Sequence, residues 1–110
     1  MRWGEDLATA SALLERAAAL APGDAAITDS LGWAYVKTQQ PARAVPLLER
    51  AARAEPADVT IQEHLGDAYW HAGRRYEARY AWAAAKVHAD AGDAKRLADK
   101  LSSGLTVGAR

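Results

Sequence analysis

The chain has 110 residues and a mass of 11.8 kDa, a size that fits one domain or a short stack of repeats and excludes a large multidomain enzyme. It contains 28 alanines, few β-branched residues and no cysteine, so the composition favours helix over strand and excludes disulfides and thiolate metal sites. Fourteen basic residues balance fourteen acidic ones, which gives no general attraction to nucleic acid or to an anionic membrane.

Charge is unevenly distributed along the chain. Residues 1–73 contain six basic and ten acidic groups, whereas residues 74–110 contain eight basic and four acidic groups. No charge-free apolar run approaches the roughly 18 residues that span a bilayer, and the first six residues do not resemble a signal peptide. We therefore expect no membrane insertion, and the compartment, cytoplasmic or periplasmic, stays open.

Helical periodicity and turn residues predict a series of helices joined by short turns. The predicted helices span residues 5–20, 24–38, 41–54, 58–72, 74–90 and 93–101. Asp24 and Asp58 are suited to cap the second and fourth helices, because a carboxylate there accepts a hydrogen bond from a free backbone N–H. Pro41 suits the first turn of the third helix. Residues 102–110 lack periodicity and are expected to form a flexible tail.

Three residues are expected to affect the backbone. Gly73 supplies the left-handed residue of one turn, whereas Gln39 occupies the equivalent place in the preceding turn, where it should cost some strain. Pro46 lies inside the third predicted helix and removes the hydrogen bond to the carbonyl of Ala42. The first turn of that helix should therefore be bent or weakly bonded.

The sequence repeats itself with a period of 34 residues. At this offset Asp24 coincides with Asp58, Ile27 with Ile61, Leu31 with Leu65, Gly32 with Gly66, Ala34 with Ala68 and Tyr35 with Tyr69. The segment 13–18, Leu-Leu-Glu-Arg-Ala-Ala, recurs verbatim at 47–52. A period of this length with helical periodicity predicts an array of helix-turn-helix units.

The recurring residues resemble the tetratricopeptide repeat (TPR) family. In that family a Leu-Gly pair and Ala-x-Tyr lie on the first helix of each repeat, two Ala and a large apolar residue lie on the second, and Pro ends it. One full repeat carries Leu31, Gly32, Ala34, Tyr35, Ala44, Leu48, Ala51 and Pro56; the next carries Leu65, Gly66, Ala68, Tyr69, Ala78, Trp82 and Ala85, with Asp90 in the place of Pro.

The resemblance implies an all-α fold, an α-α superhelix of one half repeat, two full repeats and a C-terminal capping helix. The array would span residues 1–101, with 5–22 as the second helix of a truncated repeat, 24–57 and 58–91 as full repeats, and 93–101 as the capping helix. Three segments resemble the C-terminal part of longer TPR proteins of proteobacteria, many of which are exported. These segments are residues 29–34, 64–70 and 73–79.

Small residues predict close helix contacts. Gly32 and Gly66 lie in the middle of helices, where Gly costs about 1 kcal/mol relative to Ala, and close approach of a neighbouring helix is the simplest compensation. Leu14, Leu48 and Trp82 are expected to be the large residues that fill the space between alanines seven residues apart.

In the TPR family, the first helices of the repeats line a concave groove that usually holds a peptide of another protein. The residues expected on that surface here are Asp29, Trp33, Val36, Lys37, Glu63, His64, Asp67, Trp70 and His71. Acidic groups beside exposed Trp favour a partner segment with basic residues next to apolar ones. The alternative is that Trp33 and Trp70 are buried against neighbouring helices. Capture of a C-terminal carboxylate is disfavoured, because Lys37 is the only basic residue of the set.

Chemistry other than binding finds little support. His64, Asp67 and His71 share a helix face and, with Glu63, could hold Zn, but the spacing is not His-Glu-x-x-His and a solvated polar face is the simpler interpretation. The sequence contains no Gly-rich phosphate loop and no nucleophile elbow. We therefore expect a protein that is not an enzyme and that uses no cofactor or metal.

A basic stretch lies near the C-terminal end. It comprises Arg74, Arg75, Arg79, Lys86, Lys95, Arg96 and Lys100. Acidic residues are interspersed among these basic ones, and Tyr76 and Tyr80 have the spacing of residues on the buried face of a helix. A solvated convex face is therefore favoured over a nucleic-acid surface.

Two functions therefore remain: an interaction module that binds a peptide, or a structural cap or self-association segment of a longer TPR protein with no ligand of its own.

The helix at 5–20 has no first helix to cover it, which leaves Trp3, Leu7, Ala10 and Leu14 partly exposed. We expect a two-fold homodimer in which these four residues pack on their symmetry mates. The alternative is a monomer with a frayed N-terminal helix.

Overall fold

The structure, a computed structural model, describes the backbone of residues 3–105 and the side chains of residues 8–105. It contains six helices: α1 (Trp3–Leu20), α2 (Ala25–Lys37), α3 (Pro41–Ala54), α4 (Val59–His71), α5 (Arg75–Val87) and α6 (Ala91–Ser103). Short turns join them, and the described residues form no strand. The all-α prediction is confirmed. Across the described part of the chain, no helix combines the length and apolar character needed to cross a membrane.

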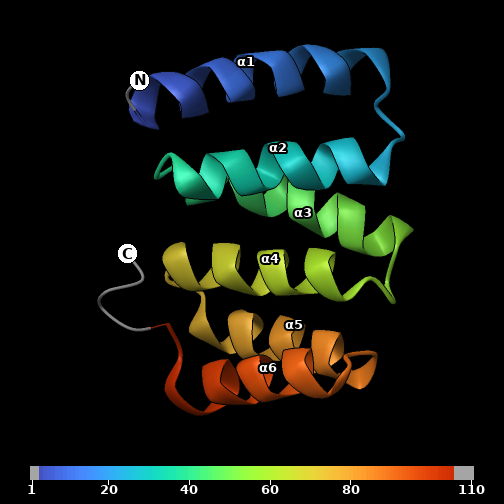
Figure 1. The fold of residues 1–110 in the computed structure, drawn as a ribbon, viewed down its shortest axis with the longest axis vertical. Helices are drawn as coiled ribbons and strands as arrows, with labels where there is room; N and C mark the ends of the chain where they lie inside the picture. Colours follow the sequence, from blue (N-terminus) through green and yellow to red (C-terminus); the bar gives the residue numbers. More distant parts are fainter. Residues whose placement is uncertain (1–2, 106–110) are drawn as a thin grey trace.

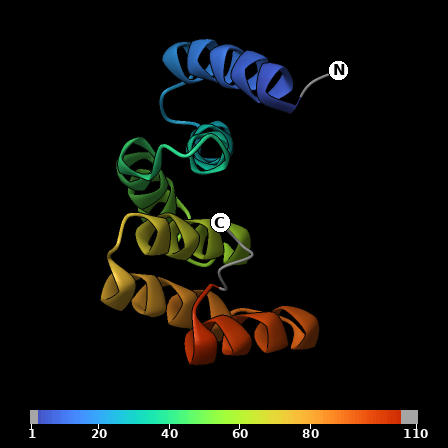
Figure 2. The ribbon, with the colours of Figure 1, turned by 90° about the vertical axis from the view of Figure 1, so that its left-hand side faces the viewer.

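The helices stack in chain order, with α1 at one end of the molecule and α6 at the other (Figure 1). Seen from the side, α3 and α5 lie on one side of the stack, and α2, α4 and α6 lie on the other (Figure 2). We call α2 and α4 first-type helices and α3 and α5 second-type helices, so that each repeat is one pair. This arrangement follows from the 34-residue period, because each pair repeats the packing of the one before.

Aspartates begin three of the helices. Asp24 Oδ1 accepts a hydrogen bond from the backbone N–H of Ile27 at 3.0 Å, and Asp58 makes the same bond with Ile61 at 3.0 Å, as predicted. Asp90 caps α6 by accepting from the backbone N–H of Asp93 at 2.8 Å. The predicted helix at 74–90 is therefore too long: α5 ends at Val87, and Asp90 belongs to the next helix.

The turns within the repeats use a left-handed residue. Gly73 has φ 82°, and Gln39, at the equivalent place, has φ 64°. Gln39 thus occupies a conformation that costs an L-residue with a Cβ roughly 1 kcal/mol or more. Pro46 lies inside α3 as expected, with its side chain exposed.

Each glycine of the repeat receives a large side chain from the second-type helix of its own repeat. A Cβ on Gly32 would lie 2.7 Å from Cγ of Leu48, and a Cβ on Gly66 would overlap the indole ring of Trp82. Both large side chains are fully buried. The close helix contact predicted from the glycines is confirmed, and it explains why Gly is tolerated in mid-helix.

The C-terminal part differs from the predictions in two ways. First, α6 continues to Ser103, and Gly104 is buried, with φ 69° and no room for a Cβ beside the ring of Trp70. Residues 102 and 103, predicted to belong to a tail, are therefore helical, and residues 106–110 lie outside the described part. Second, Tyr76 and Tyr80 are 82% and 74% exposed, so their core-like spacing was misleading: both lie on the outer face of α5.

Candidate functional site

A concavity of about 410 Å³ lies where α2, α4 and α6 meet. It is lined by Trp33, Val36, Lys37, Gln39, Asp67, His71, Lys100 and Leu105. Five of the predicted groove residues therefore come together around one hollow. The first-type helices supply most of the lining, because they share the same side of the stack (Figure 2).

Trp33 forms the aromatic wall of this concavity. Its ring stacks on His64, with centroids 4.1 Å apart and planes tilted by 13°. At the edge of the His64 ring, Nδ1 lies 2.8 Å from Oδ1 of Asp29. The ammonium of Lys37 lies 5.0 Å from the Trp33 ring centroid. The indole is therefore held in place by α4 and remains half-buried, with part of its surface accessible.

Glu63 is not available to a ligand. The guanidinium of Arg96 donates two hydrogen bonds to its carboxylate, at 2.9 and 2.7 Å, and Lys100 donates a third at 2.7 Å. Burial alone would raise the pKa of Glu63, but the hydrogen bonds and charges of Arg96 and Lys100 outweigh it and lower the pKa from 4.5 to about 2. The hydrogen bonds of Arg96 to Glu63, followed by its bond to Asp93, raise the pKa of Arg96. Glu63 thus anchors α6 to α4.

Asp67 is a second anchor for α6. Its carboxylate accepts a hydrogen bond from Nε1 of Trp82 at 2.9 Å and two from Lys100, at 3.0 and 3.1 Å. Asp67 is 6% exposed, and its buried charge is compensated by the ion pair with Lys100. An edge of Asp67 borders the concavity, but its oxygens are already paired.

Trp70 packs against Gly104, the residue that follows α6. Gly104 lies directly on its ring, Trp82 packs against it with centroids 5.6 Å apart, and the guanidinium groups of Arg75 and Arg79 lie 4.6 and 5.2 Å from it. Of the two tryptophans predicted for the groove, Trp33 borders it and Trp70 packs against neighbouring elements. Trp70, like Trp33, is half-buried, so its packing against these elements leaves part of the ring exposed.

Three further residues that were not predicted for the groove line the concavity: Gln39, Lys100 and Leu105. The prediction that Arg96 and Lys100 belong to a solvated basic stretch is wrong, because Lys100 is only 18% exposed and both pair with acidic residues of α4. A signal was present: two basic residues four apart on one helix match two acidic residues, Glu63 and Asp67, four apart on another.

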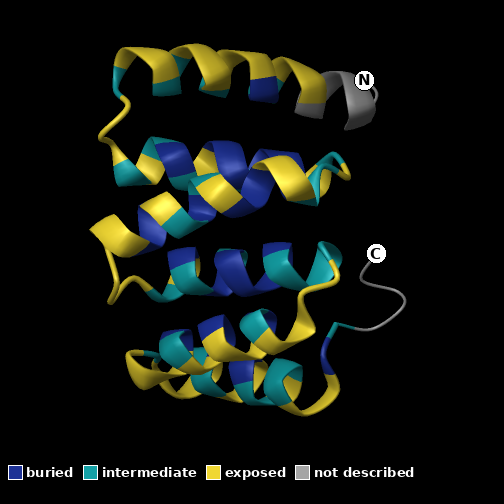
Figure 3. Ribbon diagram, turned by 180° about the vertical axis from the view of Figure 1, so that it is seen from behind, coloured by how far each residue is buried: buried dark blue, intermediate teal, exposed yellow. Residues whose placement is uncertain are grey.

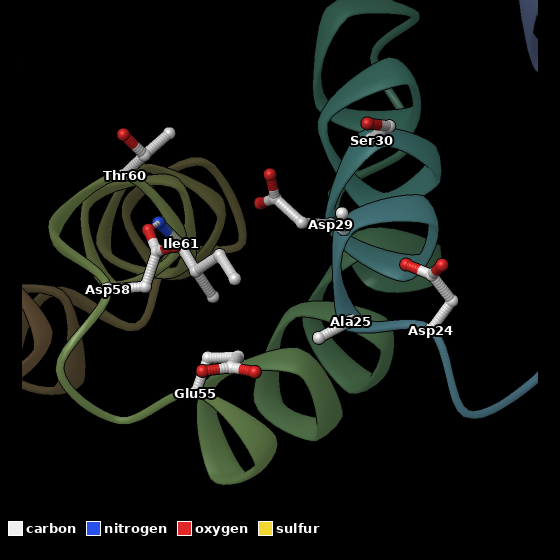
Figure 4. Close-up of a pocket in the computed structure, with 9 residues that line it drawn as sticks. Asp24, Ala25, Asp29, Ser30, Glu55, Asp58, Thr60 and Ile61 are labelled. Carbon is white, nitrogen blue, oxygen red and sulfur yellow. Dashed lines mark hydrogen bonds between the residues drawn. The ribbon is translucent and has the colours of Figure 1, made fainter.

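A second concavity, of about 450 Å³, opens at the N-terminal ends of α2 and α4 (Figure 4). Its acidic lining residues are Asp24, Asp29, Glu55 and Asp58. Asp24 and Asp58 are engaged as helix caps, and Asp29 contacts His64. This acidic concavity begins one helical turn from Trp33, since Asp29 and Trp33 are four residues apart on α2.

Potential metal ligands do not converge. Within the described part of the chain, no group of three or more His, Cys, Asp or Glu side chains is placed to hold an ion. His64 faces Trp33 and Asp29, while Asp67 faces Trp82 and Lys100.

Two of the predicted self-association residues can be placed. Ala10 and Leu14 are half-buried on α1, and Leu14 packs partly against the core of the first repeat. The side chains of Trp3 and Leu7 lie outside the described residues.

Comparisons with known proteins support the repeat architecture. No protein-family model and no curated protein matches the sequence. Among solved structures, the chain is similar to a mutant of MamA, a TPR-containing protein, with 30% sequence identity and a TM-score of 0.67. The similarity covers 86% of this chain and 60% of that one, so this chain spans less than two thirds of the MamA chain. The chain thus has the fold of a TPR-like helical-repeat solenoid.

Proposed function

We propose that the chain is a non-catalytic protein-interaction module that binds a peptide segment of a partner in the concavity between α2, α4 and α6. The half-buried indole of Trp33, which borders this concavity, is the observation that carries this proposal. It is an aromatic surface on a rigid helix, held by the His64 stack and bordered by Val36. Such preorganised aromatic residues are frequent hot spots in protein interfaces.

The partner segment would combine apolar and basic residues. An apolar side chain fits against Trp33, because Glu63 and Asp67 are already neutralised by Arg96 and Lys100. A basic side chain about one helical turn away would reach the acidic concavity that begins at Asp29. Because the apolar contact at Trp33 and the acidic concavity at Asp29 lie in a fixed order along α2, an extended segment would bind in one orientation.

Site-specific photo-crosslinking tests the proposal. In one variant a photoreactive residue replaces Lys37, which is exposed and borders the concavity. In a second variant of the same chain it replaces Lys86, which is exposed on α5, for comparison. We expect partners that are captured from position 37 only, and that are lost when Trp33→Ala is added. Tyr80→Ala removes an exposed aromatic residue elsewhere and serves as the matched control. Identical partners with and without Trp33→Ala would refute the groove.

A second candidate function is self-association through α1. Ala10 and Leu14 are half-buried, whereas the residues 34 positions later, Ala44 and Leu48, are fully buried. The incomplete cover of α1 supports a homodimer through the stripe Trp3, Leu7, Ala10 and Leu14, or a structural role in a longer TPR protein. Sedimentation velocity at increasing protein concentration tests it. A constant monomer mass would exclude the homodimer.

A further inference from the structure

The outer face of α5 carries a line of exposed apolar side chains. The inner side of this helix consists of buried residues, which are Ala78, Ala81, Trp82 and Ala85. Four exposed residues lie on the opposite side at spacings of four, three and four, and we call them the α5 outer stripe: Tyr76, Tyr80, Ala83 and Val87. The three large side chains of this stripe are 74–82% exposed. Figure 3 shows exposed and buried residues in turn along α5.

This face points outward because of its place in the repeat. At the 34-residue offset the stripe corresponds to four residues of α3: Ala42, Pro46, Glu49 and Arg53. Helix α3 has two helices before it and three after it, yet Glu49 is half-buried and the other three residues are exposed. The same face is therefore uncovered in a repeat with neighbours on both sides. What distinguishes α5 is its chemistry, since it has two tyrosines and a valine where α3 has alanine, proline and arginine.

A small apolar hollow adjoins the stripe. It has a volume of about 170 Å³ and lies between α4 and α5, where Tyr76 and Tyr80 meet Leu65 and Tyr69. An apolar cavity of about 150 Å³ is large enough to bind benzene. The hollow therefore has room for one large apolar side chain of a partner.

Basic residues run along one side of the stripe. They are Arg75, Arg79 and Lys86, all of them exposed. The guanidinium groups of Arg75 and Arg79 lie over the Trp70 ring, and Nε of Arg79 donates a hydrogen bond to the carbonyl of Leu101 at 3.3 Å. Within residues 8–105, none of these three cations forms a salt bridge with a carboxylate. Their charge is thus available to a partner.

From these observations we propose that the α5 outer stripe binds an amphipathic helix of another protein, with acidic residues beside its apolar face. Spacings of four and three residues are those of the apolar positions of a coiled coil, and the stripe extends for roughly 16 Å along α5. An apolar side chain of the partner enters the hollow beside Tyr80, and its acidic residues face Arg79 and Lys86.

This second surface is separate from the concavity. Helix α5 lies on the same side of the stack as α3, whereas α2, α4 and α6, which line the concavity, lie on the other side (Figure 2). The inference therefore goes beyond the proposed peptide-binding role, and one chain has two faces for two partners.

Other occupants fit the stripe less well. Three basic residues neutralise few phosphates, and bases do not stack on Ala83 or Val87, which disfavours nucleic acid. A second copy of the chain brings the same basic residues, and an antiparallel pair of α5 helices places the two basic rows side by side. An acidic helix meets neither obstacle.

A designed peptide tests the inference on the whole chain. The probe is a fluorescent peptide of about three heptads with leucine at its a and d positions and glutamate at its e and g positions, where repulsion opposes pairing of the peptide with itself. A second probe has lysine in place of glutamate. Fluorescence anisotropy measures both. We expect the glutamate peptide to bind about tenfold more tightly than the lysine peptide, and its affinity to fall as salt is added.

Variants locate the binding surface. Tyr80→Glu places a charge in the stripe and should weaken binding of the glutamate peptide by about tenfold or more. Arg79→Glu combined with Lys86→Glu should reverse the preference, so that the lysine peptide binds better. Arg16→Glu makes the same kind of charge change at an exposed site of α1 and is the matched control. Neither it nor Trp33→Ala, at the concavity, should change the affinity.

Four results would overturn the inference. Neither peptide binds; Tyr80→Glu binds as well as the unmodified protein; Trp33→Ala abolishes binding, which places the peptide in the concavity; or the double charge reversal leaves the preference unchanged. A single-stranded oligonucleotide that binds more tightly than the peptide, or a dimer of the chain that Tyr80→Glu dissociates, would show a different occupant. Circular dichroism checks that each variant keeps its helices, and Val87→Glu replaces Tyr80→Glu if that variant unfolds.

Discussion

The indole Nε1 of Trp82 donates a hydrogen bond to Oδ1 of Asp67 at 2.9 Å, and both side chains are buried. Trp82 is the large residue that covers Gly66, and Asp67 is the next residue after that glycine. The bond fixes the indole over the glycine, while Lys100 of α6 binds the same carboxylate. The carboxylate of Asp67 therefore connects α4, α5 and α6, and the Trp82 ring has little freedom to make room for another atom.

Replacing Gly66 should destabilise the protein. In Gly66→Ala the new Cβ would overlap the fixed Trp82 ring, and overpacking of this kind costs roughly 1 to 3 kcal/mol, more than the ~1 kcal/mol that Ala gains over Gly in a helix. Gly32→Ala should cost less, because it meets the flexible side chain of Leu48. Urea denaturation of both variants measures the difference. Equal stability of the two would contradict the role of the ring.

The anchor of α6 should weaken in acid. The pKa of Glu63 is lowered to about 2, so the stability that its ion pairs provide is fully present above about pH 4.5 and is lost as the pH falls from 4.5 towards 2. The shift corresponds to at most roughly 3 kcal/mol. Thermal unfolding between pH 7 and 2 measures this loss. The Glu63→Gln variant should be less stable than the unmodified protein at pH 7 and should lose less stability as the pH falls. If the stabilities of the two proteins fell in parallel with pH, the ion pairs of Glu63 would not be what anchors α6.

Tyr69 should lose its hydrogen bond to Glu49 in alkali. Burial, followed by the hydrogen bond and charge of Glu49, raises the pKa of Tyr69 from 10 to about 12. Its stabilising contribution is therefore present below about pH 10 and is lost as the pH rises towards 12. Tyr69→Phe should lower the free energy of unfolding by about 1 kcal/mol at neutral pH. It should also remove the component of the phenolate absorbance that appears near pH 12, which ultraviolet titration detects.

The two left-handed turn residues should respond in opposite directions. Gln39→Gly relieves a positive φ that costs a residue with a Cβ about 1 to 2 kcal/mol, partly offset by the greater freedom of glycine in the unfolded chain. We expect a gain of several tenths of a kcal/mol. Gly73→Ala should instead lose about 1 kcal/mol, since it introduces the same strain. If the melting temperatures of both variants shifted in the same direction, the positive φ at these turns would not be the cause of the stability changes.

The local and periodic features of this protein were determined by its sequence alone. The 34-residue period predicted the paired helices, and Asp24 and Asp58 fixed where two of them begin, because a cap depends only on residues three positions away. Gly32 and Gly66 revealed the close helix contacts, since the cost of Gly in a helix requires a compensating neighbour.

Only the tertiary structure decided which neighbour covers each helix face. Spacing along a helix places residues on one side, but it does not identify the segment that packs there. It therefore does not show that Tyr76 and Tyr80 are exposed, or that Gly104 packs against the ring of Trp70. Glu63 and Asp67 have the spacing of groove residues, yet they pair with Arg96 and Lys100 of a helix some thirty residues later. Such long-range pairs are set by how the repeats stack, whereas caps and periodicity depend on residues nearby in the chain.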